Sequence, residues 1–215
     1  MIFEEKTIST ERIYEGAILN LRKDKVTVCH GESYREIVEH RGGAVIAAVK
    51  DDGTMPMVKQ YRKAVGRVML EVPAGKIDPG EENPEKTALR ELKEETGYSA
   101  DHITLLTRMY PSVGYSEEIL YIYLCTDLTA GETDFDENEA IDIEEYPVET
   151  LYQMVMEGRI EDGKSQTAIL MVKGLLSEGK IPVCWKQPEL ENRKESEADA
   201  AALRAAAPAD SDNDF

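Results

Sequence analysis

The segment from Asn83 to Gly97 is the feature that most constrains how this chain folds. Asn83 can cap a helix, Pro84 suits the first helical position, and Gly97 suits the left-handed residue that follows a last turn. The segment is therefore predicted to be a helix of about four turns. Strand-like segments lie on both sides of it, so a layered α+β fold is expected rather than a doubly wound parallel sheet.

Alternating and β-branched patterns mark the expected strands. An antiparallel ribbon is predicted within residues 11–40, ahead of a mixed or antiparallel sheet in the main domain. The strands of that sheet are expected at residues 44–49, 55–61, 68–72, 103–110, 119–125 and 141–146. Two further helices are predicted at residues 148–156 and 166–176, where apolar residues recur at three- and four-residue spacing.

Composition divides the chain into three expected parts. Residues 1–40 form the ribbon, which is the expected dimerisation element, and residues 41–185 form the main domain. After Trp185 the chain becomes rich in alanine and acidic residues. We therefore expect residues 186–215 to be an acidic, disordered tail that takes no part in the active site.

The charge balance narrows the classes of function. The chain has 25 lysine and arginine residues against 43 aspartate and glutamate residues, which gives a formal net charge of −18. Such a chain repels nucleic acid and anionic membranes, so neither is an expected partner. Three cysteines without disulfide or metal-ligand spacing favour the reducing cytoplasm, as does the lack of a signal peptide pattern.

The predicted helix carries three glutamates that converge on one face. Glu91, Glu94 and Glu95 lie three and four positions apart, and Ala88 and Leu92 belong to the opposite, core-facing stripe. Like charges at this spacing destabilise a helix by about 0.2–0.5 kcal/mol per pair. A hard divalent cation such as Mg²⁺ would relieve that repulsion, because it prefers oxygen ligands. The alternative is an ordinary solvated acidic helix face.

The sequence before the helix favours metal binding. A strand that reaches Glu71 and Val72 ends in a loop rich in proline and glycine, and this loop leads directly into the helix. Loop and helix together resemble the signature of the Nudix hydrolase superfamily. The matching residues are Gly75, Glu81 or Glu82, Arg90, Glu91, Leu92, Glu94, Glu95, Gly97 and Tyr98.

The resemblance has two departures. If Glu81 is the first glutamate of the signature, eight residues separate it from Arg90, where the family pattern has seven. The additional residue falls in the loop before the helix, so either Glu81 or Glu82 can fill that position. Tyr98 stands where the family has an aliphatic residue.

The resemblance implies a fold and a reaction. The fold is an α/β/α sandwich with a mixed sheet. The reaction is hydrolysis of a nucleoside diphosphate derivative by attack of water on a phosphorus of its pyrophosphate. Mg²⁺, or Mn²⁺, is the implied cofactor, because the diphosphate charge must be neutralised and the pKa of the attacking water lowered.

Roles for individual residues of the signature follow from the same resemblance. Glu94 is implied to complete or support the metal site, and Arg90 to hold a glutamate in place. The implied metal ligands are Glu91, Glu95 and a backbone carbonyl of Ala74 or Gly75.

Segments outside the signature resemble the ADP-ribose pyrophosphatase branch of the superfamily. They are Arg35–His40, Gln60–Arg62, Glu71–Gly75, Gly114–Glu118 and Asp136–Glu139. The branch implies that Arg62 binds substrate phosphate, a role that suits a guanidinium. The further implied substrate contacts are Arg35, Tyr115 and Glu118. Val113 departs from the branch, which usually has proline there, so the preferred sugar or nucleotide stays open.

The acidic segment before the last predicted strand supplies a general base in this branch. Glu137 is implied as the base and Glu139 as a metal ligand, or the reverse. A loop that closes over bound substrate can bring such a carboxylate to the attacking water. Taken alone, the segment would be interpreted as a solvated acidic turn.

The leading hypothesis is therefore Mg²⁺-dependent hydrolysis of ADP-ribose or a related nucleotide sugar to a nucleoside monophosphate and a sugar phosphate. The alternatives are a Nudix hydrolase of another nucleoside diphosphate derivative, such as a dinucleoside polyphosphate, and a nucleotide sensor without catalysis. The branch also implies a homodimer in which residues 5–40 pack across the two-fold axis and contribute to the partner's substrate pocket.

Overall fold

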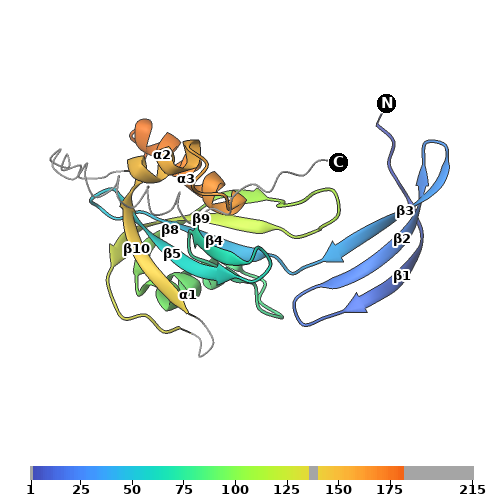
Figure 1. The fold of residues 1–215 in the computed structure, drawn as a ribbon, viewed down its shortest axis with the longest axis horizontal. Coiled ribbons are helices and arrows are strands. Elements are labelled where there is room, and N and C mark those ends of the chain that lie inside the picture. Colours follow the sequence, from blue (N-terminus) through green and yellow to red (C-terminus); the bar gives the residue numbers. More distant parts are fainter. Residues whose placement is uncertain (1, 136–139, 182–215) are drawn as a thin grey trace, which may run out of the picture. The chain divides into compact units, whose positions relative to one another are not determined.

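The structure is a computed structural model, and it describes residues 2–135 and 140–181. Glu137, Glu139 and the predicted tail at residues 186–215 therefore lie outside the described residues. Figure 1 shows the order of the elements along the chain.

The N-terminal segment forms the antiparallel ribbon that the sequence predicts. Its strands are β1 (Thr7–Glu15), β2 (Asn20–Val28) and β3 (Gly31–Glu39), and β2 pairs with both of the others. The ribbon begins four residues earlier than its predicted start at residue 11. Every residue of β1 is exposed, and this strand forms one edge of the ribbon.

The main domain contains two sheets. In the four-stranded sheet β4 and β9 run parallel and the other pairs run antiparallel, so the predicted mixed sheet is confirmed. The strand order is β7 (Ala74–Lys76), β4 (Gly43–Ala48), β9 (Leu120–Thr129) and β8 (Ser99–Met109) in this sheet, and β10 (Ile141–Pro147), β5 (Thr54–Arg62) and β6 (Arg67–Glu71) in the antiparallel sheet.

Strand β7 was not predicted, because its three residues follow Pro73 and include Gly75, which are typical of a loop. The strand forms because Ala74, Gly75 and Lys76 pair with the first residues of β4. This pairing is a tertiary contact, so the local sequence pattern does not predict it.

The three helices are α1 (Pro84–Thr96), α2 (Val148–Met156) and α3 (Gly163–Ser177). Helix α1 has the predicted caps: the Asn83 side chain accepts a hydrogen bond from the Glu85 N–H, and Gly97 has φ 75°. Helix α3 starts earlier than predicted, because Asp162 caps it. None of the helices in the described part of the chain is long and apolar enough to span a membrane.

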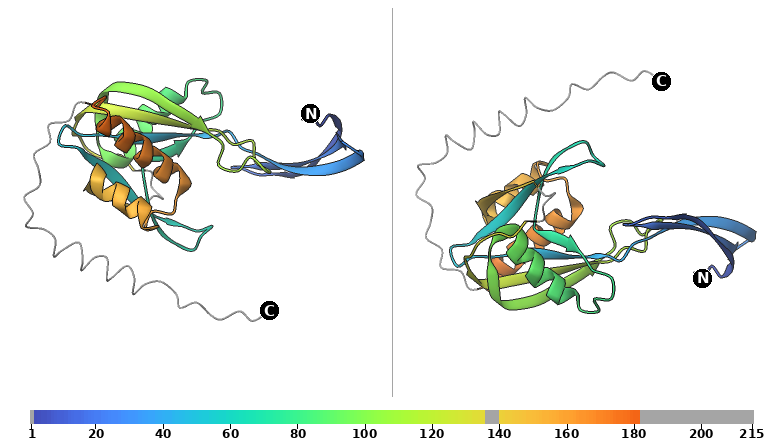
Figure 2. Two further views of the ribbon diagram at one scale, coloured as in Figure 1. Left: turned by 90° about the horizontal axis from the view of Figure 1, so that it is seen from above. Right: turned by 90° about the horizontal axis from the view of Figure 1, so that it is seen from below.

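Strand β4 separates two apolar layers, because it is buried on both faces. Ala44 and Ile46 pack with Leu92 of α1, whereas Val45 packs in the cluster that contains Ile169 of α3. Figures 1 and 2 show α1 on one side of the sheets and α2 and α3 on the other. The α/β/α sandwich implied by the sequence is therefore confirmed.

Replacing Leu92 by alanine should test this layering. Leu92 is fully buried between α1 and the sheet, so Leu92→Ala should lower the free energy of unfolding by about 2–5 kcal/mol. Leu170→Ala is the matched control, because Leu170 on α3 is 43% exposed. Urea denaturation measures both, and an equal loss for the two variants would contradict the proposed packing of α1.

Candidate active site

A cleft of about 820 Å³ brings the predicted carboxylates of α1 together with Arg62. Its walls come from α1, β7, the first residues of β4, the end of β5 and the start of α3. The charged side chains that line it are Arg62, Lys76, Asp78, Arg90, Glu91, Glu94, Glu95, Glu118, Asp162 and Lys164. Apolar side chains, among them Ile18, Met109 and Leu120, line another part of the cleft.

Glu95 is buried, with 4% of its surface exposed, which argues against the alternative interpretation of a solvated acidic face at this position. One of its carboxylate oxygens accepts a hydrogen bond of 3.0 Å from the Ala74 N–H. The bond ties α1 to β7, and it explains how a charged residue can occupy the buried side of the helix.

Gly75 is required by the position of the Glu91 carboxylate. A Cβ atom built on Gly75 would lie 1.8 Å from Glu91 Oε1. Only glycine leaves this space free, so β7 and α1 approach each other with the carboxylate of Glu91 packed against the strand's backbone.

Arg90 lies between two glutamates of the same helix. Its guanidinium is 2.8 Å from a Glu91 oxygen and also contacts Glu94, and it is 3.3 Å from Asp78. These contacts place positive charge beside the carboxylates and restrict their movement. Glu81 and Glu82, the two candidates for the first signature glutamate, are not among the residues that line the cleft.

The donor set of this region fits a hard divalent cation. The carboxylates of Glu91, Glu94 and Glu95 and the carbonyls of β7 are all oxygen donors, as Mg²⁺ requires. Within residues 2–135 and 140–181, no group of three or more histidine, cysteine, aspartate or glutamate residues is arranged to hold a metal ion. Arg90 and the Ala74 N–H instead occupy oxygens of these glutamates.

Arg62 is anchored at the other side of the cleft by Glu71. Its Nε and Nη2 atoms lie 2.7 and 2.9 Å from the two carboxylate oxygens, a bidentate arrangement. Lys164 of α3 also binds Glu71. Burial raises the pKa of the Glu71 carboxyl, but the two cations outweigh burial, so this pKa lies below its ordinary value.

Sequence reasoning missed the partnership of Glu71 with Lys164. A charged residue at the end of the apolar segment 68–72 was a usable signal, because a buried carboxylate needs a cationic partner. The identity of the second partner could not be found in this way, since Lys164 lies 93 positions further along the chain.

The other predicted substrate contacts are only partly brought together. Glu118 lines the cleft, 3.2 Å from Nδ1 of His40. Tyr115 is 58% exposed and does not line the cleft. Arg35 lies on β3 and binds Glu5 within the ribbon, also away from the cleft of its own chain.

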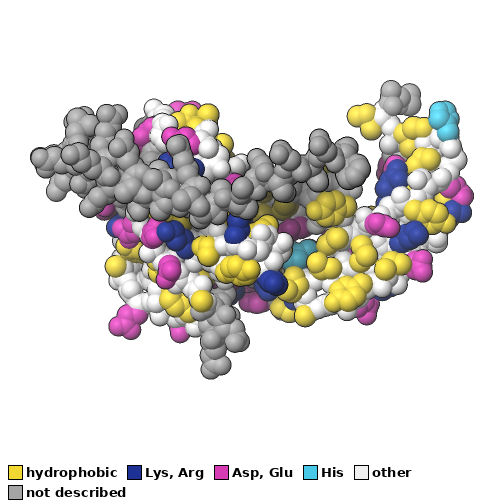
Figure 3. Space-filling view, viewed as in Figure 1, with side chains coloured by type: hydrophobic (Ala, Val, Ile, Leu, Met, Phe, Trp, Pro, Cys, Tyr) yellow, Lys and Arg dark blue, Asp and Glu magenta, His cyan; other side chains and the backbone are white. Residues whose placement is uncertain are grey.

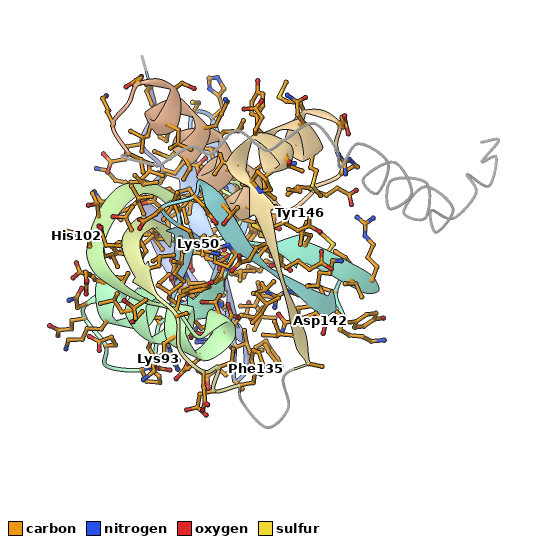
Figure 4. The ribbon with its side chains drawn as sticks, turned by 90° about the vertical axis from the view of Figure 1, so that its left-hand side faces the viewer. Lys50, Lys93, His102, Phe135, Asp142 and Tyr146 are labelled. Atoms are coloured by element: carbon orange, nitrogen blue, oxygen red, sulfur yellow. The ribbon has the colours of Figure 1, made fainter. Side chains whose placement is uncertain are left out.

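The segment before residues 136–139 is attached to the end of α1. The Asp134 N–H donates a hydrogen bond of 3.0 Å to the Glu94 carbonyl. In Figure 4, Phe135 and Asp142 lie on the same lower edge of the main domain as Lys93 of α1. The chain therefore enters the predicted base segment from the end of the carboxylate helix.

Gly75→Ala should disrupt cation binding, because the new Cβ must displace the Glu91 carboxylate. We expect the affinity for Mg²⁺, measured by calorimetry, to fall at least about tenfold. Gly174→Ala on α3 is the control, because its Cβ would meet nothing within 4 Å. Unchanged affinity in Gly75→Ala, with folding checked by circular dichroism, would contradict the assignment of Glu91.

Comparison with known proteins identifies relatives of the chain and a solved structure with a similar fold. The chain is 42% identical to the ADP-ribose pyrophosphatase of Bacillus subtilis (strain 168), over 77% of this chain and 91% of that protein. It is 39% identical to the methanol dehydrogenase activator of Bacillus methanolicus, over 78% of this chain and 92% of that protein. A crystal structure of an ADP compounds hydrolase shares the fold, with a TM-score of 0.72 at 20% identity, and the match covers 84% of this chain and 99% of the other.

A family model also matches the part of the chain that contains the candidate site. The family model described as the NUDIX domain matches residues 39–168, more than half of the chain. This segment contains Gly75, Arg62 and the glutamates of α1, so the resemblance drawn from the sequence is confirmed. The chain belongs to the Nudix hydrolase family.

Proposed function

We propose that this enzyme hydrolyses the pyrophosphate bond of ADP-ribose or a related nucleoside diphosphate sugar, which yields AMP or another nucleoside monophosphate and a sugar phosphate. The observation that carries the proposal is the cleft itself, because it places the carboxylates of α1 and the guanidinium of Arg62 around one space. A diphosphate needs both: oxygen ligands for its cations and a cationic hydrogen-bond donor for its own oxygens.

Glu91 and Glu95 are the proposed ligands of Mg²⁺ or Mn²⁺, with the carbonyl of Ala74 or Gly75. The cation, when bound, neutralises the diphosphate and makes the attacking water more acidic. Glu94 supports the site, and Arg90 holds Glu91 and Glu94 in place through its two ion pairs.

Glu137 is the proposed general base and Glu139 a further metal ligand, or the reverse. The attachment of Asp134 to the Glu94 carbonyl supports this proposal, because it starts the segment beside the carboxylate helix. Steady-state kinetics separate the two roles. Replacing the base by glutamine should lower kcat by about 10²–10⁴-fold, whereas replacing the ligand should chiefly weaken cation affinity.

The two free cysteines within the described residues, Cys29 and Cys125, support a reducing compartment, and we propose the cytoplasm. Nucleic acid and membranes are not proposed partners, because the net charge of −18 repels them. The proposed partner is a second copy of the chain.

The proposed homodimer uses the N-terminal ribbon, residues 1–40, while residues 41–185 act as the hydrolase domain. Ile8, Ile13 and Tyr14 on β1 are about half exposed, and Figure 3 shows hydrophobic side chains over the ribbon. Arg35 does not line the cleft of its own chain, and it belongs to residues 5–40, which we propose contribute to the partner's pocket.

Ile13→Asp should therefore convert the dimer to a monomer, because it places charge within an apolar contact. Sedimentation velocity measures the change, and kcat/KM should fall with it. Met156→Asp at the end of α2 is the control, because Met156 is 63% exposed and lies outside the ribbon. If the wild-type protein sediments as a monomer, the dimer proposal fails.

A substrate panel tests the reaction. We expect nucleoside monophosphate release from ADP-ribose or another nucleotide sugar with Mg²⁺, and its abolition by EDTA. Glu95→Gln should lower kcat/KM by at least about 100-fold. Glu85→Gln is the control, because Glu85 lies on the exposed first turn of the same helix and does not line the cleft.

The panel also includes NADH and diadenosine polyphosphates, which test the alternative substrates. Activity that persists in EDTA, or that Glu95→Gln leaves undiminished, would contradict the mechanism. A wild-type protein that binds ADP-ribose and hydrolyses nothing in the panel would instead be a nucleotide sensor.

A further inference from the structure

A cluster of five side chains joins β6 to the start of α3 at one side of the cleft. It consists of Arg62, Glu71, Asp162, Lys164 and Ser165, and we call it the Glu71 cluster. Four of the five members carry charge, and Glu71 and Ser165 are 3% and 0% exposed.

Glu71 is the centre of the cluster. A buried carboxylate is costly unless cations and hydrogen bonds compensate for lost water. Arg62 supplies two of these hydrogen bonds, and the ammonium group of Lys164 contacts the same carboxylate oxygen as Arg62 Nη2. Both cations therefore share one negative charge.

Lys164 is held firmly. Its Nζ atom is also 2.9 Å from Asp162 Oδ2, and only 14% of its side chain is exposed. The same Asp162 oxygen accepts hydrogen bonds from the N–H and hydroxyl of Ser165. The Ser165 hydroxyl oxygen in turn accepts a 2.8 Å bond from the Val72 N–H, so the start of α3 is fixed to the strand end that carries Glu71.

The arrangement controls which donors Arg62 presents to the cleft. Within the described residues, the side-chain hydrogen bonds of Arg62 use Nε and Nη2, which leaves the Nη1 hydrogens available to a ligand. Lys164 binds both Glu71 and Asp162, so the two cations and two carboxylates of the cluster balance one another. Loss of Lys164 would leave Arg62 alone to balance the buried carboxylate.

We propose that Lys164 is a positioning residue for the hydrolysis, which acts through Glu71 to hold the Arg62 guanidinium at the substrate phosphate. The inference rests on the proposed function, because it assumes that Arg62 binds a phosphate of the nucleotide sugar. Lys164 itself does not touch the substrate in this scheme.

Steady-state kinetics on the best substrate of the panel test the proposal. Lys164→Met should raise KM about tenfold and change kcat less than about threefold, because the missing interaction acts on binding. Lys164→Arg should restore KM to within about threefold, since it retains the charge. Lys173→Met is the matched control, because Lys173 lies on the same helix and pairs with Glu149 outside the cleft.

A double-mutant cycle separates positioning from a structural role. If Lys164 acts through Arg62, Lys164→Met should raise KM no further in an Arg62→Met background. If it only supports the fold, its effects should be additive with Arg62→Met, and urea denaturation should show a matching loss of stability without rescue by Lys164→Arg. Additive effects on KM would overturn the proposal.

The experiments distinguish a failure of the proposed hydrolysis from a failure of the proposed role of Lys164. If the wild-type enzyme releases no nucleoside monophosphate from any substrate of the panel, the proposed function fails. If the wild type is active and Lys164→Met leaves KM unchanged, the proposed function stands and the role of Lys164 is wrong.

Discussion

The contact between the buried face of α1 and β7 is the constraint on which the rest of the site depends. Glu95 accepts the Ala74 N–H, and Glu91 occupies the space that Gly75 leaves open. A helix is normally held to a sheet by apolar side chains, and Leu92, the residue after Glu91, packs against the sheet in this way. Here two carboxylates lie in the same interface, so charged groups occupy positions where apolar side chains would normally pack. Buried carboxylates are tolerated only where hydrogen bonds or opposite charges compensate them, as the Ala74 N–H does for Glu95 and Arg90 does for Glu91.

Among the described residues, the cleft is lined by six carboxylates and four cationic side chains, so acid exceeds base there as in the whole chain. The chain carries a formal net charge of −18, yet Arg62, Arg90 and Lys164 all line the cleft. Each of these cations is paired with a carboxylate that holds it in place, as Glu71 holds Arg62. The acidic surface therefore disfavours large polyanions, while fixed cations within the cleft can still accept a small phosphate compound.

Sequence patterns predicted the elements that depend on local chemistry. The caps of α1 and the ribbon follow from turn residues and alternation, the mixed sheet was implied by the family resemblance, and the structure confirms all three. The strand β7, the burial of Glu95 and the partnership of Glu71 with Lys164 could not be predicted in this way. Each depends on a neighbour that the fold supplies from a distant part of the chain, such as β4 for β7.

The ribbon contacts the segment after β8 through Val38 of β3, and Arg22 of β2 also pairs with Glu117 in that segment. The Val38 N–H donates to the Tyr115 carbonyl at 2.7 Å, and the Val38 carbonyl accepts from the Glu117 N–H at 3.1 Å. The family segment begins at Glu39, one residue beyond this point. A protein trimmed to that segment would keep every carboxylate of α1, yet it would lose both hydrogen bonds that support the residues leading to Glu118. The stretch that the family model matches is thus shorter than the stretch that supports the residues leading to Glu118 in the cleft wall.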